Sequence, residues 1–320
     1  MNPELQQRLE KLEAKYAATG QDWISYLDGL IYSDYLSYWD YIHLDVLLNL
    51  QQPKTKIPDE NIFIIYHQIT ELYFKLVRLE LQQIIDMGTA PSAEWFDIRI
   101  RRCVRYFEAL TKSFAIMSDG MDKNQFLQFR MALLPASGFQ SAQYRKIEMD
   151  TTSFQNLVDK NERHRFSSES TISEMYPFIY WKFGATDRET GKKTYTLIQF
   201  EEKYSEELMR LAEKRVNNNV WSVFESLKPE EKTESIKKSM RLFDLQVNAL
   251  WPMAHFGTAV RYLKAEPEEI AATGGTNWME YLPPQLQKRI FFPTLWEEAE
   301  KEKQAVPEDL QRGTSSDPIF

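Results

Sequence analysis

The sequence predicts an all-α protein, a bundle of helices with one small β-hairpin inserted near residues 178–198. Apolar residues recur every three or four positions over long segments, which is the period of an amphipathic helix. Only 11 glycines and 14 prolines interrupt the 320 residues, few for a β protein of this length. Hydrophobic residues make up 43% of the chain and aromatic residues 13%, which is enough for a substantial core.

The longest helical pattern covers residues 58–81 and predicts a helix that begins at Asp59, a favourable N-cap residue behind Pro58. A second stripe, which contains Phe63 and His67, makes this helix apolar on more than one side. Such a helix lies in the middle of a bundle, so we expect His67 inside the protein. The residues expected to form the main buried stripe are Ile62, Ile65, Ile69, Leu72 and Leu76.

Charge and composition exclude several classes of protein. A net charge of −8 argues against a general nucleic-acid binder, because no basic excess is available to neutralise phosphates. A single cysteine, Cys103, cannot form an intramolecular disulfide and fits a reducing compartment. No apolar stretch is long enough to cross a membrane, and the first residues have no apolar signal core. We therefore expect a soluble, cytoplasmic protein.

A further helix is predicted at residues 92–117, followed by one that carries Phe126, Arg130 and Leu133 on a single face. Arg130 would then point inward, where arginine is rare unless it is paired. Two interpretations stay open, an internal salt bridge and bidentate binding of a substrate carboxylate.

The pattern of helices breaks at residues 176–200, where two β-rich runs flank a turn at Thr190-Gly191 and predict the hairpin. Helices resume at residue 201, and the last one, ending near residue 263, carries His255 on an apolar face. Pro252 kinks or restarts that helix just before His255. His255 is either a core histidine or a ligand, and Gly257 and Ala259 leave room beside it for a flat ring. The face carries Trp251, His255, Thr258, Ala259 and Tyr262.

With one cysteine and four histidines far apart in sequence, a zinc site of the usual kind is not expected. A metal would more readily be held by very few protein ligands, as in haem, where one histidine suffices.

Aromatic residues crowd the segment 21–53, which predicts either a core or subunit-contact segment or a lid over an aromatic ligand. Both apply if a neighbouring subunit supplies the lid. We expect residues 1–57 to form an N-terminal arm and lid segment, 58–300 a helical catalytic domain and 301–320 a polar tail.

Four blocks of the sequence resemble the tryptophan 2,3-dioxygenase family, whose members are all-helical haem enzymes. They are YWDYIHLDVLLNLQQP (38–53), DENIFIIYHQITELYFKL (59–76), FRMALLPASGFQSAQYRKIE (129–148) and a WxxxH element followed by TGG (251–275). The second and third blocks are the most specific. The sequence WPMAHFGT departs from the family pattern, with Pro252 and without the arginine usual near that histidine.

The resemblance implies a role for each matching residue. His255 becomes the proximal ligand of haem b and so the metal ligand, and His67 the distal histidine that hydrogen-bonds the substrate indole N–H. Arg130 holds the substrate carboxylate, and Thr273 contacts the amino-acid end of the substrate. Phe63, Phe126 and Leu133 pack around the substrate side chain. Tyr38 and Ile42 reach into the pocket of a neighbouring subunit, and Ser137 and Trp251 lie near the haem.

The reaction that the resemblance implies is insertion of both atoms of O2 across the indole C2–C3 bond of L-tryptophan, giving N-formylkynurenine, the first step of the kynurenine pathway. The family forms homotetramers, so a homotetramer with exchanged N-terminal segments is implied. Two alternatives stay open. One is a related haem enzyme that oxidises another indole or aromatic amino acid, and the other is a helical haem-binding or scaffold protein without turnover.

Overall fold

The computed structural model describes residues 2–34, 36–88, 92–133, 140–167, 169–186, 190–263 and 289–297. The chain divides into two compact units, residues 1–52 and residues 53–320. Among the described residues every regular element is helical, as predicted. None of the described helices is both long and apolar enough to cross a membrane.

The first unit consists of four short helices: α1 (Pro3–Ala17), α2 (Trp23–Tyr32), α3 (Tyr38–Tyr41) and α4 (Leu44–Leu48). Side chains at the helix starts fix their limits, because Asn2, Asp22 and Ser37 each accept a hydrogen bond from a backbone N–H of the first turn. No described residue of this unit is buried. The described apolar side chains of this unit therefore form no core within the unit.

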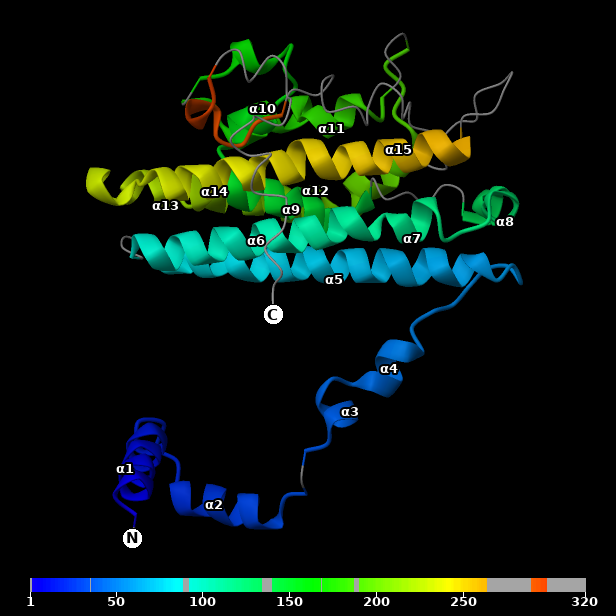
Figure 1. Cartoon of the computed structure of the whole chain (residues 1–320). Helices are drawn as coiled ribbons and strands as arrows, with labels where there is room; N and C mark the ends of the chain where they lie inside the picture. Colours follow the sequence, from blue (N-terminus) through cyan, green and yellow to red (C-terminus); the bar gives the residue numbers. More distant parts are fainter. Residues whose placement is uncertain are drawn as a thin grey trace. The chain divides into compact units, whose positions relative to one another are not determined.

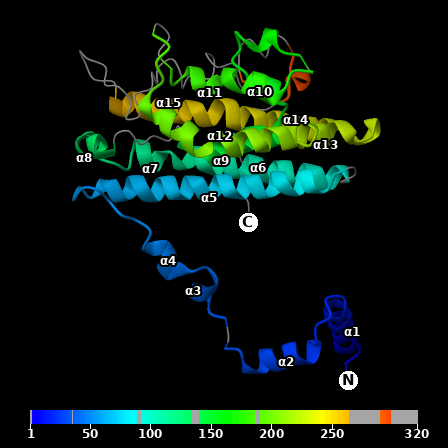
Figure 2. The same cartoon turned by 180° about the vertical axis from the view of Figure 1, so that it is seen from behind.

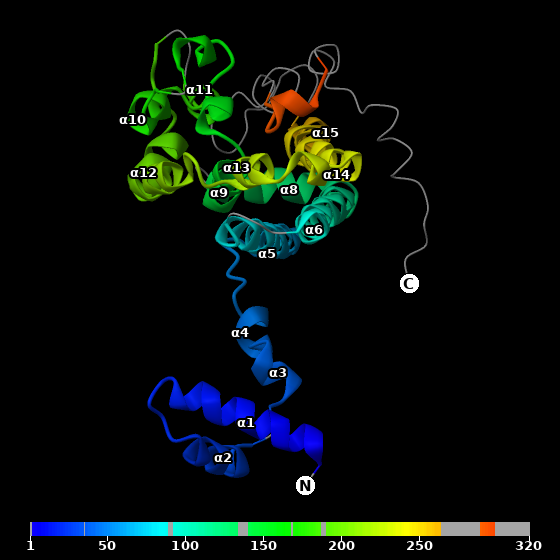
Figure 3. The same ribbon diagram turned by 90° about the vertical axis from the view of Figure 1, so that its left-hand side faces the viewer.

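The second unit is a helical bundle whose long members are α5, α6, α12, α14 and α15 (Figure 1). Figure 2 shows α14 and α15 following one another along nearly one line. Helices α5 and α6 pack side by side, and α9 and α14 pack against this pair (Figure 3). The helices are α5 (Asp59–Asp86), α6 (Ala93–Ser113), α7 (Ala115–Ser118), α8 (Lys123–Phe129), α9 (Ala142–Thr151), α10 (Ile172–Met175), α11 (Tyr180–Phe183), α12 (Tyr195–Arg215), α13 (Val220–Ser226), α14 (Glu234–Leu245) and α15 (Trp251–Leu263).

The main core of this unit forms where α5, α6, α9, α12 and α14 meet. Its largest fully buried side chains are aromatic, with Trp181 and Phe243 among them. A second, smaller apolar cluster lies around Tyr66 and Phe129 and includes residues of α15.

Helix α5 begins at Asp59, as predicted, but Asp59 is not its N-cap residue. Pro58 occupies the N-cap position, and the Asp59 carboxylate instead accepts a hydrogen bond from the N–H of Asp122, at 2.7 Å. A cap was predicted because Asp is a good capping residue. The contact with the start of α8, distant in sequence, gives the carboxylate another partner.

The predicted buried stripe of α5 was largely wrong. Tyr66, Phe74, Val77 and Leu81 face the core, whereas the stripe from Ile65 to Leu76 is exposed, with Leu72 at 48%. The helix lies at the edge of the bundle rather than in its middle (Figure 3). Periodicity finds apolar faces, but it does not say which face packs against the same chain.

The predicted β-hairpin near residues 178–198 was also wrong. The described part of this segment contains α11, the start of α12 and two isolated antiparallel bridges, Thr186 with Lys193 and Ile179 with Val158, with no strand. The reason is local, because the Thr194 side chain accepts a hydrogen bond from the N–H of Leu197 and caps α12. The β-rich run after Thr194 therefore forms the beginning of α12 rather than a strand.

Candidate active site

His67 lies on α5 among aromatic side chains. Its ring centroid is 4.1 Å from that of Phe63, one turn earlier, and 6.0 Å from that of Tyr66, edge-on. The imidazole is half-buried. The helical spacing that suggested an aromatic environment for this histidine therefore describes its surroundings correctly.

A single hydrogen bond sets the tautomer of His67. Its Nδ1 lies 2.7 Å from the backbone oxygen of Phe63. A carbonyl oxygen can only accept, so Nδ1 must carry the proton, and Nε2 of the neutral ring is left as an acceptor. Burial lowers the pKa of His67, while the bond to Phe63 and the charge of Glu71 act in the opposite direction. The ring is thus neutral near pH 7 and can accept an N–H at Nε2.

His255 lies on α15, and its ring is stacked on Phe114 at a centroid distance of 5.7 Å. Phe114 also contacts Trp251, at 4.5 Å. Desolvation by the surrounding protein lowers the pKa of His255 to about 4, and the charge of His67 makes a smaller contribution in the same direction. The His255 side chain nevertheless keeps substantial accessible surface, so the ring is both neutral at pH 7 and open to a ligand.

The smaller apolar cluster joins the two histidine helices. Phe63, from α5, lies 6.3 Å from Phe126, whose ring lies 4.9 Å from that of Tyr262, on α15. Leu133 and Trp251 pack against the same cluster. The structure therefore brings together predicted site residues from α5, α8, the following turn and α15.

Arg130 opens the 3-10 turn Arg130–Leu133, directly after α8. It is 4% exposed, so the inward direction predicted for this side chain is found. Burial lowers the pKa of Arg130 below its ordinary value, although a guanidinium remains charged at any physiological pH.

The chemistry of His255 suits a haem cofactor. His255 offers a neutral, accessible imidazole, and the neighbouring surface is mostly aromatic. In the described parts of the chain, no three His, Cys, Asp or Glu side chains form a metal-binding group. A single histidine ligand beside an apolar surface is the donor set of haem, so the residues present fit that group.

Two further predicted site residues, Tyr38 and Ile42, belong to the 1–52 unit, where Tyr38 is 70% exposed and Ile42 is partly exposed. Ser137 and Thr273 lie outside the described residues.

Sequence reasoning missed Phe114, which stacks on His255, and Tyr66, which faces His67. Phe114 continues the apolar spacing of Phe107 and Leu110, and this signal could have found it. Tyr66 is adjacent to His67 in sequence, but only the packing of α5 on α6 and α7 directs its ring to Phe114, 5.6 Å away.

The family model of tryptophan 2,3-dioxygenase matches residues 29–255, more than half of the chain. The chain belongs to the tryptophan 2,3-dioxygenase family. The matched segment runs from the N-terminal aromatic region to His255 itself and includes His67 and Arg130. Thr273 lies beyond its end.

Individual relatives in this family show both partial and nearly full-length similarity. A tryptophan 2,3-dioxygenase of Ruegeria sp. (strain TM1040) is 42% identical over 118 residues, which are 37% of this chain and 42% of the relative. A tryptophan 2,3-dioxygenase 2 of Ralstonia nicotianae is 41% identical over 36% of this chain and 33% of the relative. In these alignments the chain spans less than half the length of its relatives. The enzyme of Ruegeria pomeroyi is 28% identical over 83% of this chain and 92% of its own length.

Proposed function

We propose that this chain is a haem-dependent dioxygenase that converts L-tryptophan and O2 to N-formylkynurenine, the first step of tryptophan breakdown by the kynurenine pathway. One observation carries the proposal. Two histidines, 188 positions apart in the sequence, lie at the two ends of a row of aromatic rings: Tyr66 lies edge-on to His67 at 6.0 Å and is 5.6 Å from Phe114, which stacks on His255 at 5.7 Å. Membership of the tryptophan 2,3-dioxygenase family supports it.

In this proposal His255 holds the iron of haem b. Its depressed pKa keeps the imidazole unprotonated at neutral pH, which is the form that binds a metal. Trp251, together with Ser137, would lie against the haem. When bound, the haem supplies the iron at which O2 is activated. The apolar side chains of Phe114 and its neighbours exclude water from this region.

The remaining residues of the proposed site bind and orient the substrate. Nε2 of His67 accepts the indole N–H, and the fixed tautomer makes this the only neutral-state role open to it. Phe63, Phe126 and Leu133 contact the indole ring, while the Arg130 guanidinium and Thr273 bind the carboxylate and amino end. Holding the substrate in a reactive orientation removes much of the entropic cost of the reaction, which accounts for a large part of enzymatic rate enhancement.

The decisive experiment is product formation. The purified chain, loaded with haem and reduced without O2, is mixed with O2 and L-tryptophan, and the ultraviolet absorption of N-formylkynurenine is followed. Product formation supports the proposal. Haem binding without product from L-tryptophan, but with turnover of another indole, would identify a related haem oxidase. Haem binding without any turnover, or no Soret band at all, would point to a binding or scaffold protein.

Arg130 provides a second test of the substrate assignment. Arg130→Ala removes a charged contact worth about 1.5–3 kcal/mol, so kcat/KM for L-tryptophan should fall roughly ten- to a hundredfold. Arg130→Lys keeps the charge without the bidentate fork and should fall in between. Tryptamine, which lacks the carboxylate, should be equally poor for all three proteins. Unchanged kinetics for L-tryptophan in Arg130→Ala would remove the proposed role.

We propose further that the chain assembles as a homotetramer, with residues 1–57 of one copy covering the site of a neighbour, 58–300 as the catalytic domain and 301–320 as a tail. The N-terminal unit exposes large apolar residues, for example Leu30 at 69% and Tyr41 at 71%. The outer stripe of α5 follows the alternating spacing of four and three residues that is typical of helix–helix contacts between chains. Its members are Ile65, Ile69, Leu72, Leu76 and Leu79.

Light scattering during gel filtration tests the assembly. Leu72→Glu places a charge in the middle of the outer stripe and should lower the molecular mass in solution. Ile98→Glu, at an exposed apolar residue of α6 outside the stripe, is the matched control and should leave the mass unchanged. A monomeric native chain would refute the tetramer.

We place the protein in the cytoplasm. Cys103 is a free, buried thiol. A chain with one cysteine cannot form an intramolecular disulfide, so an oxidising compartment would not stabilise it. Fractionation of cells that express the native chain, followed by detection with an antibody, tests this location.

A further inference from the structure

The junction between α14 and α15 is a π-helix, Gln246–Leu250, placed directly before the helix that carries His255. The Trp251 N–H donates to the oxygen of Gln246, five residues back, rather than four as in an α-helix. A π-turn adds one residue to a helical turn, and therefore rotates everything that follows by about 100°. The direction in which His255 points depends on this turn.

Pro252 gives the turn a chemical reason. In an α-helix, a proline at this position would clash with the carbonyl four residues earlier, that of Asn248. The wider π-turn relieves that contact. In a π-turn, each carbonyl oxygen accepts a hydrogen bond from the N–H five residues later. The partner of the Val247 oxygen would therefore be residue 252, but proline has no N–H.

Tyr144 supplies a donor to that carbonyl. Its hydroxyl lies 2.8 Å from the oxygen of Val247, which a tyrosine O–H can only approach as the donor. Both groups are buried, so an unpaired carbonyl there would be costly. The tyrosine comes from α9, which ends far from α15 in sequence.

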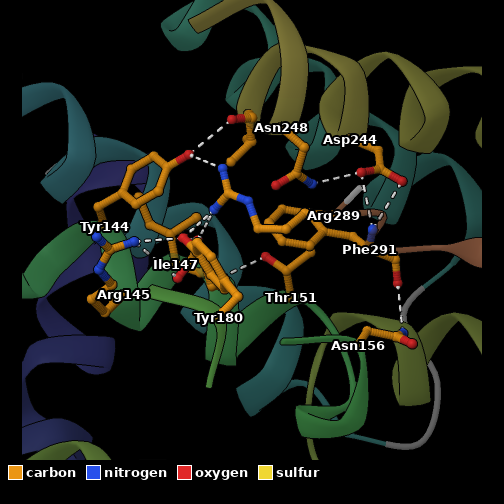
Figure 4. A network of polar contacts seen from close by, with 12 residues as sticks. Tyr144, Arg145, Ile147, Thr151, Asn156, Tyr180, Asp244, Asn248, Arg289 and Phe291 are labelled. Carbon is orange, nitrogen blue, oxygen red and sulfur yellow. Dashed lines mark hydrogen bonds and ion pairs between the residues drawn. The ribbon is translucent and has the colours of Figure 1, made fainter. Parts of the chain in front are cut away.

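The position of Tyr144 is itself fixed by a buried network (Figure 4). Arg289 donates to the Tyr144 hydroxyl through Nη2, at 3.3 Å, and its Nη1 contacts Glu148 and the hydroxyl of Tyr180. The Tyr144 ring packs on Phe74 of α5 at 5.5 Å. The hydroxyl therefore has little freedom to leave Val247.

A second contact holds the same turn from its N-terminal side. The Asp244 carboxylate accepts hydrogen bonds from the side chain of Asn248, at 2.7 Å, and from the backbone N–H of Phe291, at 3.0 Å (Figure 4). At the other end of α15, the Tyr262 hydroxyl lies 2.5 Å from the backbone oxygen of Met117, its nearest acceptor, and 3.0 Å from that of Met121. Helix α15 is thus anchored at both ends, with His255 between them.

We propose that Tyr144 is a positioning residue for His255, whose hydroxyl replaces the N–H missing at Pro252, holds the π-turn and thereby sets the rotation of α15. The position of the turn and its anchor follow from the fold alone. The consequence for haem rests on the proposed function, in which His255 binds the iron. Tyr144 contacts neither haem nor substrate in this proposal and acts only through the helix.

Tyr144→Phe removes the hydroxyl and keeps the ring. In the full-length chain, hydrogen–deuterium exchange of the amides in residues 253–256 should become roughly tenfold faster, because the turn that precedes them loses one buried hydrogen bond. In the haem-loaded protein, the iron–histidine stretching band in the resonance Raman spectrum should shift or broaden. Tyr180→Phe is the control, because it removes a hydroxyl from the same network that has no contact with the π-turn; it should change both signals much less than Tyr144→Phe does.

A rescue variant separates this role from general stability. Pro252→Ala restores an N–H that can donate to Val247, so Tyr144→Phe in the Pro252→Ala background should show native exchange and a single native Raman band. Lack of rescue, or equal effects of Tyr144→Phe and Tyr180→Phe, would overturn the proposal. If Tyr144→Phe alone does not fold, recovery of folding by Pro252→Ala, but not by a distant stabilising change, supports it.

The two readouts also distinguish failure of this inference from failure of the proposed function. If the native chain bound no haem, the proposed function would fail, whereas amide exchange would still report whether Tyr144 holds the π-turn. If haem bound through His255 but exchange and Raman bands ignored Tyr144→Phe, only the inference would fail.

Discussion

The two helices that carry the histidines are built differently. Helix α5 runs without interruption for 28 residues, and His67 is fixed by a bond to its own preceding turn, at Phe63. Helix α15 follows a π-turn and a proline, and the bonds that fix its start come from Tyr144 and, through Asp244, from Phe291. His67 is positioned locally, whereas His255 is positioned by residues that are distant in sequence.

This difference predicts which substitutions change the position of each histidine. A local hydrogen bond within one regular helix survives most changes elsewhere in the protein. A turn held by a side chain from α9 and, through Asp244, by the backbone N–H of Phe291 depends on the packing of the whole second unit. Substitutions far from the site should therefore affect His255 more than His67.

The largest effect should come from removing the two imidazoles themselves. His255→Ala should abolish the Soret band, because the proposed iron ligand is lost. His67→Ala should keep the band and lower kcat/KM for L-tryptophan roughly tenfold, the value of one hydrogen bond to substrate. Absorption spectra and steady-state kinetics of both variants decide this. Unaltered haem binding in His255→Ala would reverse the assignment of the two histidines.

The next largest effect concerns stability, at Asp244. This buried carboxylate also accepts from the N–H of Phe292 and from the indole of Trp296, at 3.2 and 2.9 Å. Asp244→Ala leaves these donors unpaired and should lower the free energy of unfolding by about 3 kcal/mol or more. Thr70→Val, which removes a bond inside α5 to the oxygen of Tyr66, should cost about 1 kcal/mol or less. Urea unfolding curves measure both, and equal losses would contradict the comparison.

A smaller effect is the pH dependence of His67. Burial lowers the pKa of His67 below its ordinary value of 6.5. The neutral ring is the form that accepts the indole N–H, and protonation occupies Nε2. The midpoint of the acidic decline in activity should therefore lie below pH 6.5. A pH profile of kcat/KM tests this; His67→Asn, which does not ionise, should lack the decline. A decline whose midpoint lies above pH 6.5 would contradict the expected direction.

The smallest effect should come from Glu71, one turn beyond His67. Its charge raises the pKa of His67, and Gln143 holds its carboxylate at 2.9 Å. Glu71→Gln removes the charge and should move the acidic decline of activity to lower pH, with little change at pH 7. Glu202→Gln, an exposed carboxylate on α12, is the control. A shift in the opposite direction would show that Glu71 acts on another group.

Much of the molecule follows from the sequence alone. Apolar spacing predicted the helices, and the start of α5 at Asp59 and the break at Pro252 were visible in the residues. The His67–Phe63 pair is separated by one helical turn, so its contact needs no other part of the chain. Family motifs connected His67, Arg130 and His255 before their positions were known. These features are local, and local geometry is set by the covalent chain and its short-range hydrogen bonds.

Other features were decided by tertiary structure. Apolar spacing on α5 was correct, yet the side from Ile65 to Leu76 turned outward because α6 and α9 pack on the opposite side. Residues 195–200, which Thr194 caps locally as a helix, bury Leu197 and Phe200 in the core, and this long-range packing outweighs their β-rich composition. The choice between an α-turn and a π-turn before His255 depends on a tyrosine from α9. The sequence around His255 does not identify that tyrosine, because burial and long-range hydrogen bonds exist only after the chain has folded.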